Sequence, residues 1–288
     1  NLAPALDFVR SLTAGPGYEG RVEEGKKHFA GFELPGRTLG IVGLGAVGGL
    51  VADTALKLGM KVLGYDPDIT VDNAWRLPSA VRRAQSVDEV FRSSDFISLH
   101  VPLVESTRHL ANAGRLALVR KGTVLLNFAR DAVVDEEAVL AAFADKRLRA
   151  YVCDFPTPRL VAHPQVVAFP HLGASTHEAE ENCAVMVADT LREFLESGNV
   201  RNSVNFPEAV LPRLPGTSRL AIANANVPNM VGQISTALAE AKLNIADLLN
   251  KSRGDLAYTL IDVEGTVSPE LVARLGAIEG VLSARAIG

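Results

Sequence analysis

Short apolar segments alternate with segments of helical periodicity over most of the first 200 residues. Residues 38–42 are uncharged and rich in β-branched side chains, which predicts a buried strand. In residues 46–58 the apolar side chains recur every three or four positions, which predicts an amphipathic helix. The same two patterns predict further strands at 61–65, 95–101, 123–128, 149–153 and 166–169, and further helices at 87–91, 112–119, 135–146 and 176–196.

Repeated strand–helix units of this kind indicate an α/β fold. Crossovers between parallel strands are right-handed, so the helices cover both faces of one parallel sheet. We therefore predict a doubly wound, Rossmann-type domain at residues 31–206. Residues 1–30 combine a short helical pattern with a Gly- and Pro-rich loop, and we interpret them as the exit segment of a truncated preceding subdomain.

A proline-rich segment separates this domain from a smaller pattern. Three prolines and a glycine fall within residues 207–217, which suits a semi-rigid linker. Residues 218–288 then follow the order strand, helix, strand, strand, helix, strand. This βαββαβ order predicts a small ferredoxin-like domain.

Composition limits the classes of protein to which the chain can belong. Of its 288 residues, 48% are hydrophobic and 22% charged, which excludes a disordered chain. The net charge of −4 gives no electrostatic reason to expect nucleic acid or an anionic membrane as a partner. Two cysteines, Cys153 and Cys183, are too few for a disulfide framework and indicate a reducing cytoplasm.

A glycine-rich loop follows the first predicted strand and opens the first predicted helix. In this GxGxxG motif, Gly43 permits the tight turn, Gly45 lets the backbone approach a pyrophosphate, and Gly48 allows close helix–strand packing. Asp66 ends the next strand, where a carboxylate accepts hydrogen bonds from ribose hydroxyls and repels a 2′-phosphate. The order of these elements predicts binding of NAD rather than NADP. The alternative is a helix-packing turn and a surface aspartate.

Polar residues with possible chemical roles follow two later strands. Arg130 comes after the 123–128 strand and can bind a carboxylate with two hydrogen bonds; alternatively, it pairs on the surface with Asp131 or Asp135. His171 lies between a strand and a long helix, and an imidazole there can accept a substrate proton; alternatively, it is structural. Ligands of doubly wound sheets bind outside the carboxyl ends of the strands, which favours the functional interpretation.

Several motifs, taken together, resemble one protein family. Residues 38–205 resemble the D-isomer-specific 2-hydroxyacid dehydrogenases, and residues 218–288 resemble an ACT domain, a small regulatory module that binds amino acids. The resemblance rests on the glycine loop, Asp66, His100-Val101-Pro102-Leu103, Asn127-Phe128-Ala129-Arg130, Val134-Asp135-Glu136-Glu137 and the segment 170–176.

The resemblance implies NAD-dependent hydride transfer from C2 of a 2-hydroxy acid, with His171 as proton acceptor and Arg130 as carboxylate anchor. With the ACT domain, it implies D-3-phosphoglycerate as substrate in serine biosynthesis, L-serine as effector and a homodimer or homotetramer. Another D-2-hydroxyacid dehydrogenase and a non-catalytic, NAD-responsive binding protein stay open as alternatives. The residues expected to contact NAD are Gly43, Gly45, Ala46, Val47, Gly48, Asp66, His100, Val101, Pro102, Phe128, Ala129, Arg130, Asp154, His171, Gly173 and Ala174.

Two features depart from the family pattern. The family places a glutamate shortly before the histidine, but no acid occurs between Asp154 and His171. Asp154 either replaces it as a catalytic residue or contacts the nicotinamide amide. The family also has a first substrate subdomain before the nucleotide domain, and residues 1–30 resemble only its exit helix and loop. We therefore predict that this chain alone binds NAD but turns over substrate poorly.

Asparagines in the smaller domain are candidates for effector binding. Asn224 and Asn226 alternate along one strand, and Asn244 precedes the next. Amide side chains both donate and accept hydrogen bonds, which suits a zwitterionic amino acid; alternatively, these residues cap turns and helix ends. The remaining histidines lack metal-ligand spacing, so no metal site is predicted. Trp75 is expected to pack beneath the loop after the second strand.

Overall fold

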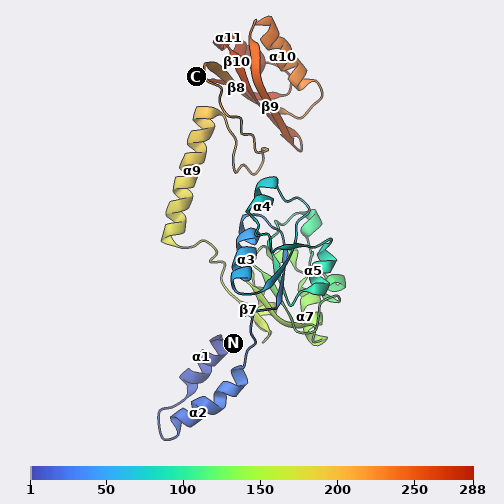
Figure 1. Cartoon of the computed structure of the whole chain (residues 1–288), viewed down its shortest axis with the longest axis vertical. Helices are drawn as coiled ribbons and strands as arrows, with labels where there is room; N and C mark the ends of the chain where they lie inside the picture. Colours follow the sequence, from blue (N-terminus) through green and yellow to red (C-terminus); the bar gives the residue numbers. More distant parts are fainter. Residues whose placement is uncertain (1) are drawn as a thin grey trace. The chain divides into compact units, whose positions relative to one another are not determined.

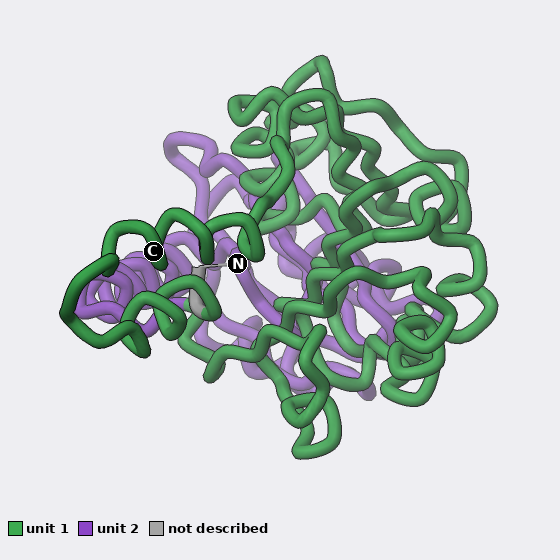
Figure 2. The backbone as a smooth tube through the Cα atoms, turned by 90° about the horizontal axis from the view of Figure 1, so that it is seen from below, with its two compact units in different colours: residues 1–173 green, residues 174–288 purple. Residues whose placement is uncertain are grey.

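The computed structural model describes residues 2–288, which divide into two compact units. Unit 1 comprises residues 1–173 and unit 2 residues 174–288 (Figure 2). The predicted boundary, a linker at 207–217, falls inside unit 2 and stays a prediction about domain organisation. No helix among the described residues combines the length and the apolar character that crossing a membrane requires.

Unit 1 is built around a seven-stranded sheet in which every neighbouring pair of strands is parallel. The strand order β3-β2-β1-β4-β5-β6-β7 reverses direction beside β1, as in a doubly wound fold. The predicted Rossmann-type sheet is thus confirmed. The strands are β1 Thr38–Val42, β2 Lys61–Tyr65, β3 Arg82–Arg83, β4 Phe96–Leu99, β5 Thr123–Asn127, β6 Leu148–Cys153 and β7 Val166–Ala168.

Helices lie on both faces of this sheet, with α3 on one side and α5 and α7 on the other (Figure 1). Polar side chains start several of them: Ser86 accepts the Glu89 N–H, and Asp135 accepts the Ala138 N–H. The helices of unit 1 are α1 Leu2–Ser11, α2 Tyr18–Gly25, α3 Ala46–Lys57, α4 Val71–Arg76, α5 Val87–Ser93, α6 Ala113–Leu116, α7 Glu136–Ala144 and α8 Pro158–Val161.

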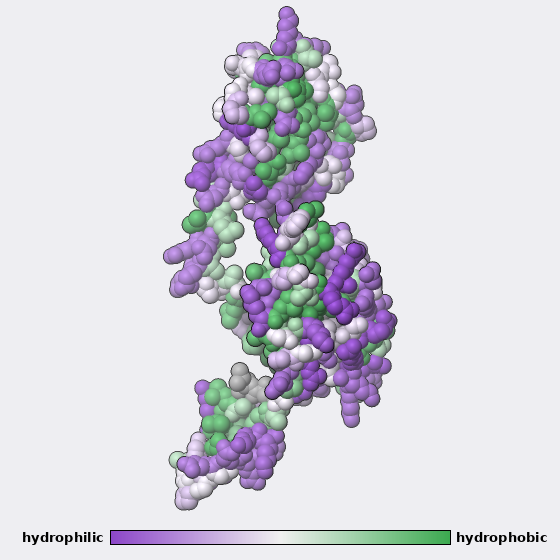
Figure 3. Space-filling view, viewed as in Figure 1, coloured by the Kyte–Doolittle hydropathy of each residue, from purple (hydrophilic) through white to green (hydrophobic). Residues whose placement is uncertain are grey.

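Two apolar cores follow from this two-sided packing. Ile41 belongs to the core beneath α3, whereas its neighbour Val42 belongs to the core beneath α5 and α7, because successive side chains of a strand point to opposite faces. An apolar groove of about 430 Å³ runs beside α3, where Val47 and Leu50 are exposed. Hydrophobic surface is visible around the place of α3 in Figure 3.

Three short elements lie outside the predicted pattern. Strand β3 consists of two exposed arginines, and α4 and α8 are only six and four residues long. The expectation for Trp75 is wrong, because its side chain is 84% exposed on α4 instead of packed beneath a loop. Helix α4 is short and has no buried residue, so it presents no buried face against which the indole ring could pack.

Unit 2 begins with the long helix α9 His177–Ser197, which ends at the left-handed Gly198 as predicted. The βαββαβ order that follows is also as predicted, and its four strands form an antiparallel sheet in the order β11-β8-β10-β9. Helices α10 and α11 pack on it through one apolar core. The elements are β8 Thr217–Ala225, α10 Met230–Glu240, β9 Asn244–Arg253, β10 Leu256–Glu264, α11 Pro269–Gly276 and β11 Val281–Ile287.

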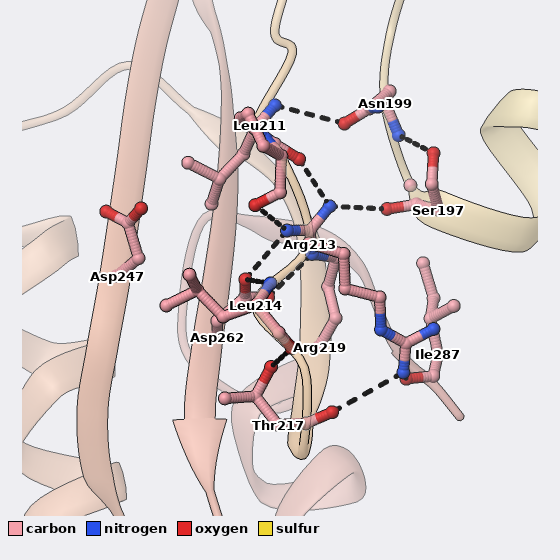
Figure 4. Close-up of polar contacts among 12 residues, drawn as sticks. Ser197, Asn199, Leu211, Arg213, Leu214, Thr217, Arg219, Asp247, Asp262 and Ile287 are labelled. Atoms are coloured by element: carbon pink, nitrogen blue, oxygen red, sulfur yellow. Dashed lines mark hydrogen bonds and ion pairs between the residues drawn. The ribbon is translucent and has the colours of Figure 1, made fainter.

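A buried ion pair ties the start of this sheet to the segment before it. Arg219 on β8 and Asp262 on β10 are directly opposite each other and fully buried. The Arg219 Nε and Nη2 donate to the two Asp262 oxygens at 2.6 and 2.7 Å (Figure 4). The guanidinium also donates to the carbonyl oxygens of Ser197, Leu211 and Pro212, so the pair fastens residues 197–212 to the sheet.

Candidate cofactor and substrate site

The predicted site residues of unit 1 gather where parallel strands end. The glycine loop follows β1, Asp66 follows β2, His100 follows β4 and Asp154 follows β6. Because the carboxyl ends of parallel strands share one edge of the sheet, the topology brings these residues together. Ala174 belongs to unit 2 and is not placed among them.

At each of the three glycines of the loop, a side chain would meet different surroundings. Gly43 has a φ of 93°, and a Cβ there would lie 2.4 Å from the His100 carbonyl oxygen. A Cβ on Gly48 would lie 2.0 Å from the Gly43 carbonyl oxygen, so the start of α3 packs against the loop itself. A Cβ on Gly45 would meet nothing within 4 Å, which leaves this stretch of backbone open to a ligand. The amino end of α3 has no side-chain cap, so its N–H groups are available for an anion.

Asp66 fixes the shape of this loop. Its Oδ2 accepts the Leu44 N–H at 2.8 Å, and its Oδ1 accepts the Asp68 N–H at 3.0 Å. Each carboxylate oxygen has a further lone pair, so the side chain can still accept hydrogen bonds from ribose hydroxyls. Asp66 therefore combines the predicted binding role with a structural one that the sequence did not reveal.

His100 holds the far side of the loop. Its backbone N–H donates to the Val42 carbonyl oxygen at 2.7 Å, and its Nε2 lies 2.8 Å from the Ser98 hydroxyl. Burial lowers the pKa of the His100 imidazole, which favours the neutral ring at pH 7. The neighbouring Val101 packs against Gly43. Through these contacts the backbone of His100 supports the turn of the glycine loop.

A buried amide shapes the turn that carries Arg130. The Asn127 Nδ2 donates to the Arg130 carbonyl oxygen at 2.9 Å and to the Tyr151 hydroxyl at 3.2 Å. Its Oδ1 accepts the Ala129 N–H at 3.1 Å. Burial raises the pKa of the Tyr151 hydroxyl, which therefore stays protonated. Sequence reasoning missed Tyr151, whose contact with Asn127 depends on the pairing of β5 with β6.

Phe155 brings the two proposed catalytic side chains to one place. The Arg130 guanidinium carbon lies 5.8 Å from the centre of the Phe155 ring, and the His171 ring lies 4.5 Å from it, centre to centre. Arg130 is exposed and makes no ion pair within the described residues. Its Nη1 donates to the Ala129 carbonyl oxygen at 2.6 Å, and its other N–H groups are available to a carboxylate. Among the described residues, Arg130 does not form the alternative ion pair with Asp131 or Asp135.

The His171 imidazole makes no hydrogen bond or ion pair with any described residue. Phe155 and Gly173 lie beside the ring. A Cβ built on Gly173 would lie 3.8 Å from the His171 Nε2. No carboxylate orients the imidazole, in agreement with the missing glutamate of the sequence. The ring is held by packing, and its two nitrogens are free for a substrate.

Asp154 is buried, and one of its oxygens lacks a partner. The residue is 7% exposed, and the Oδ1 atom, fully shielded, makes no hydrogen bond within the described chain. A buried acceptor without a donor costs free energy, so such an atom at a candidate site marks a place where a ligand donor belongs. The carboxamide of NAD supplies an N–H donor of this kind. Together with the open backbone at Gly45, this atom shows that the residues present fit NAD.

We expect Asp154→Leu to stabilise the ligand-free chain by about 1–3 kcal/mol, because it removes the unpaired buried acceptor. The same change is expected to weaken NADH binding about tenfold, or ~1.4 kcal/mol, since the carboxamide loses its partner. Urea unfolding and NADH titration measure the two effects. Asp145→Leu, which removes an exposed carboxylate at the end of α7, is the control. A loss of stability with unchanged NADH affinity would contradict the assignment.

The three asparagines of unit 2 do not form one cluster within the chain. Asn224 is buried, and its amide donates to the Ala225 carbonyl oxygen at 2.7 Å. Asn226 is exposed next to it, whereas Asn244 begins β9 at the opposite end of the sheet, opposite Glu264. The effector role of these residues stays a prediction, and a shared site requires two chains.

Comparison with known proteins defines the class. Residues 5–173 match the D-isomer specific 2-hydroxyacid dehydrogenase family, NAD binding domain. The chain belongs to this family, and NAD is the cofactor of the matched domain.

Two of the curated relatives carry the same name. The chain is 34% identical to D-3-phosphoglycerate dehydrogenase of Haemophilus influenzae over 88% of its own length and 64% of the relative's. It is 32% identical to D-3-phosphoglycerate dehydrogenase of Methanocaldococcus jannaschii over 92% and 51%. The NAD⁺-bound 3-phosphoglycerate dehydrogenase of Entamoeba histolytica is 30% identical, with a TM-score of 0.53 over 61% of this chain and 57% of that one. The chain thus spans about half to two thirds of these relatives.

Proposed function

We propose that the chain belongs to an NAD-dependent oxidoreductase that converts D-3-phosphoglycerate to 3-phosphohydroxypyruvate in serine biosynthesis. The observation that supports this most strongly is the grouping of Arg130 and His171 around Phe155, at the sheet edge that carries the glycine loop. The names of the relatives support the substrate. The two cysteines, Cys153 and Cys183, are free, which agrees with the proposed cytoplasmic location.

The proposed chemistry uses the side chains of Arg130 and His171. Arg130 binds the substrate carboxylate with paired hydrogen bonds and polarises the developing C2 carbonyl. An imidazole nitrogen of His171 takes the proton of the C2 hydroxyl as the C–H electron pair leaves. The glycine loop and Asp66 would hold NAD, which would supply the hydride acceptor. Asp154 orients the nicotinamide through its unpaired oxygen.

The unpartnered imidazole favours one alternative. An imidazole with no carboxylate beside it is less well oriented and gains no stabilisation when it becomes charged. This observation favours a non-catalytic, NAD-responsive protein on the same fold as the second candidate. Another D-2-hydroxyacid dehydrogenase remains an outcome of the substrate test below.

Residues 218–288, which lie within unit 2, are proposed to form a ferredoxin-like ACT domain that regulates the enzyme. Its βαββαβ order and strand arrangement support this assignment. L-serine is the proposed effector, and Asn224, Asn226 and Asn244 are its proposed contacts in a homodimer or homotetramer. Asn244 lies at the opposite end of the sheet from the other two, so in this proposal one chain supplies Asn224 and Asn226 and a second chain supplies Asn244.

We predict that His171→Asn lowers the rate of NADH formation from D-3-phosphoglycerate by about 10²–10⁴-fold, because it removes the proton acceptor. NADH affinity is expected to stay the same. Absorbance at 340 nm is followed for this chain and for a longer chain that carries the first substrate subdomain, which is expected to turn over faster. His177→Asn, on the exposed start of α9, is the control.

Three outcomes separate the candidates. Faster turnover of a non-phosphorylated 2-hydroxy acid favours another dehydrogenase of the family. No turnover in either chain, with NADH bound, favours the non-catalytic protein. Inhibition of the longer chain by L-serine supports the regulatory role of residues 218–288.

A further inference from the structure

Positive charge is concentrated at the edge of the sheet in unit 1 that carries the amino ends of the strands. The residues concerned lie at or within three residues of the first residues of β1, β2, β3, β4, β5 and β6. Two cavities of about 210 and 400 Å³ open here, and both are lined by Asp95 and Arg120. The candidate cofactor site follows the carboxyl ends of the same strands, about 13–17 Å away at ~3.3 Å per residue.

The lining of these cavities is strongly basic. Asp95 is the single acidic residue among those that line either cavity. The chain as a whole has a net charge of −4, so this edge differs sharply in charge from the rest of the molecule. Six lysines and arginines, which we call the cationic edge, line the two cavities: Arg37, Lys61, Arg82, Arg120, Lys121 and Arg149.

Asp95 offsets only one of these six positive charges. Its Oδ2 accepts the backbone N–H of Thr38 at 2.8 Å and so serves the start of β1. Its Oδ1 forms long ion pairs with the Arg37 Nη1 at 4.0 Å and the Arg120 Nη1 at 3.9 Å, and neither distance is short enough for a hydrogen bond. The guanidinium donors of both arginines therefore remain available to a ligand.

An aromatic residue holds two of the arginines in place. The guanidinium carbons of Arg37 and Arg149 lie 5.4 and 4.5 Å from the centre of the Phe32 ring. The Phe32 ring in turn lies 5.7 Å from that of Phe96, on β4. A guanidinium packed on a ring keeps its N–H groups free at its rim, so these contacts orient the donors at low entropic cost.

We propose that the cationic edge binds a small anion with two or more phosphate groups. A single phosphate in the smaller cavity can satisfy Arg37, Arg120 and Arg149, but it leaves Lys61 and Arg82 of the adjoining cavity unpaired. A second phosphate on the same molecule reaches them past Arg120, which lines both cavities. This site is separate from the dinucleotide site and does not depend on the catalytic activity.

Pyrophosphate is the probe, titrated into the chain by calorimetry with NADH at saturation so that the glycine loop is filled. One pyrophosphate per chain is expected. Arg120→Ala and Arg149→Ala are each expected to weaken binding at least about tenfold, because each removes a charged donor. Arg192→Ala removes the same charge from an exposed position on α9 and is expected to leave the affinity unchanged.

Parallel titrations with inorganic phosphate and with tripolyphosphate distinguish binding of a single phosphate from binding of linked phosphate groups. Tighter binding of tripolyphosphate than of the monophosphate supports the proposal, and the reverse overturns it. The proposal is also overturned if pyrophosphate does not bind or if the Arg192 variant loses as much affinity as the other two. Unchanged NADH binding in all variants shows that the fold is intact.

Discussion

Asp262→Ala is expected to destabilise unit 2 by about 3–5 kcal/mol, because it leaves the guanidinium of Arg219 buried without its counter-charge. The loss exceeds that of a typical core truncation to a smaller side chain, since the arginine cannot reach water without opening the sheet. The carbonyl oxygens of Ser197, Leu211 and Pro212 remain as acceptors but carry no full charge. Urea unfolding, with hydrogen exchange of the β8 and β10 amides to identify the unit, measures the effect.

A paired replacement distinguishes charge from packing. Arg219→Met combined with Asp262→Leu removes both charges and fills much of the same space, so most of the lost stability is expected to return. Lys57→Ala, which breaks an exposed ion pair with Asp53 on α3, is the control and is expected to cost at most about 1 kcal/mol. If the double variant is as unstable as Asp262→Ala, the buried charge is not the cause.

The same ion pair predicts how stability depends on pH. Burial raises the pKa of Asp262, but hydrogen bonds from Arg219 and the Leu214 N–H outweigh this effect and hold it below its ordinary value of 3.8. The unfolded chain therefore binds this proton more readily than the folded chain. The contribution of Asp262 is fully present above about pH 4 and is lost as the pH falls through the lower pKa of the folded state.

Gly48→Ala is expected to weaken NADH binding by about 100-fold or more, or at least ~2.7 kcal/mol. The added Cβ would lie 2.0 Å from the Gly43 carbonyl oxygen, so α3 must move away from the loop that holds the pyrophosphate. The same shift is expected to lower the stability of unit 1. Fluorescence titration with NADH and thermal unfolding measure the two effects.

Two neighbouring glycines are matched controls. A Cβ on Gly49 would lie at an ordinary contact distance of 3.6 Å from Leu77, so Gly49→Ala is expected to keep the affinity and gain helix stability. Gly45→Ala meets nothing within 4 Å in the protein and is expected to weaken NADH binding without loss of stability. Equal NADH affinities for Gly48→Ala and Gly49→Ala would contradict this account of the loop.

The sheet of unit 1 was largely predictable because each strand is a short buried run whose neighbours in the sequence are amphipathic helices. Strand β3 escaped prediction since its two exposed arginines carry no apolar pattern. Helix α8 had usable signals, a capping Thr157 and Pro158 at the first helical position, which sequence reasoning did not weigh. The prediction for Trp75 was wrong because a large apolar side chain is usually buried, whereas this one is exposed.

The predicted site residues were found from motifs, but their contacts depend on strand register. Phe155 and Tyr151 become part of the site only because β5 pairs with β6, which places Asn127 opposite Cys153. The pair of Arg219 with Asp262 likewise joins residues that are 43 positions apart. No local pattern carries such information, since register is decided when the strands pack together.

The account depends most on the binding of a dinucleotide at residues 43–48. Calorimetric titration of the 288-residue chain with NADH tests this directly, with NADPH as the comparison ligand. We predict one NADH per chain, bound more tightly than NADPH because the Asp66 carboxylate repels a 2′-phosphate. Folded protein that takes up no NADH, or that prefers NADPH, would contradict the central claim.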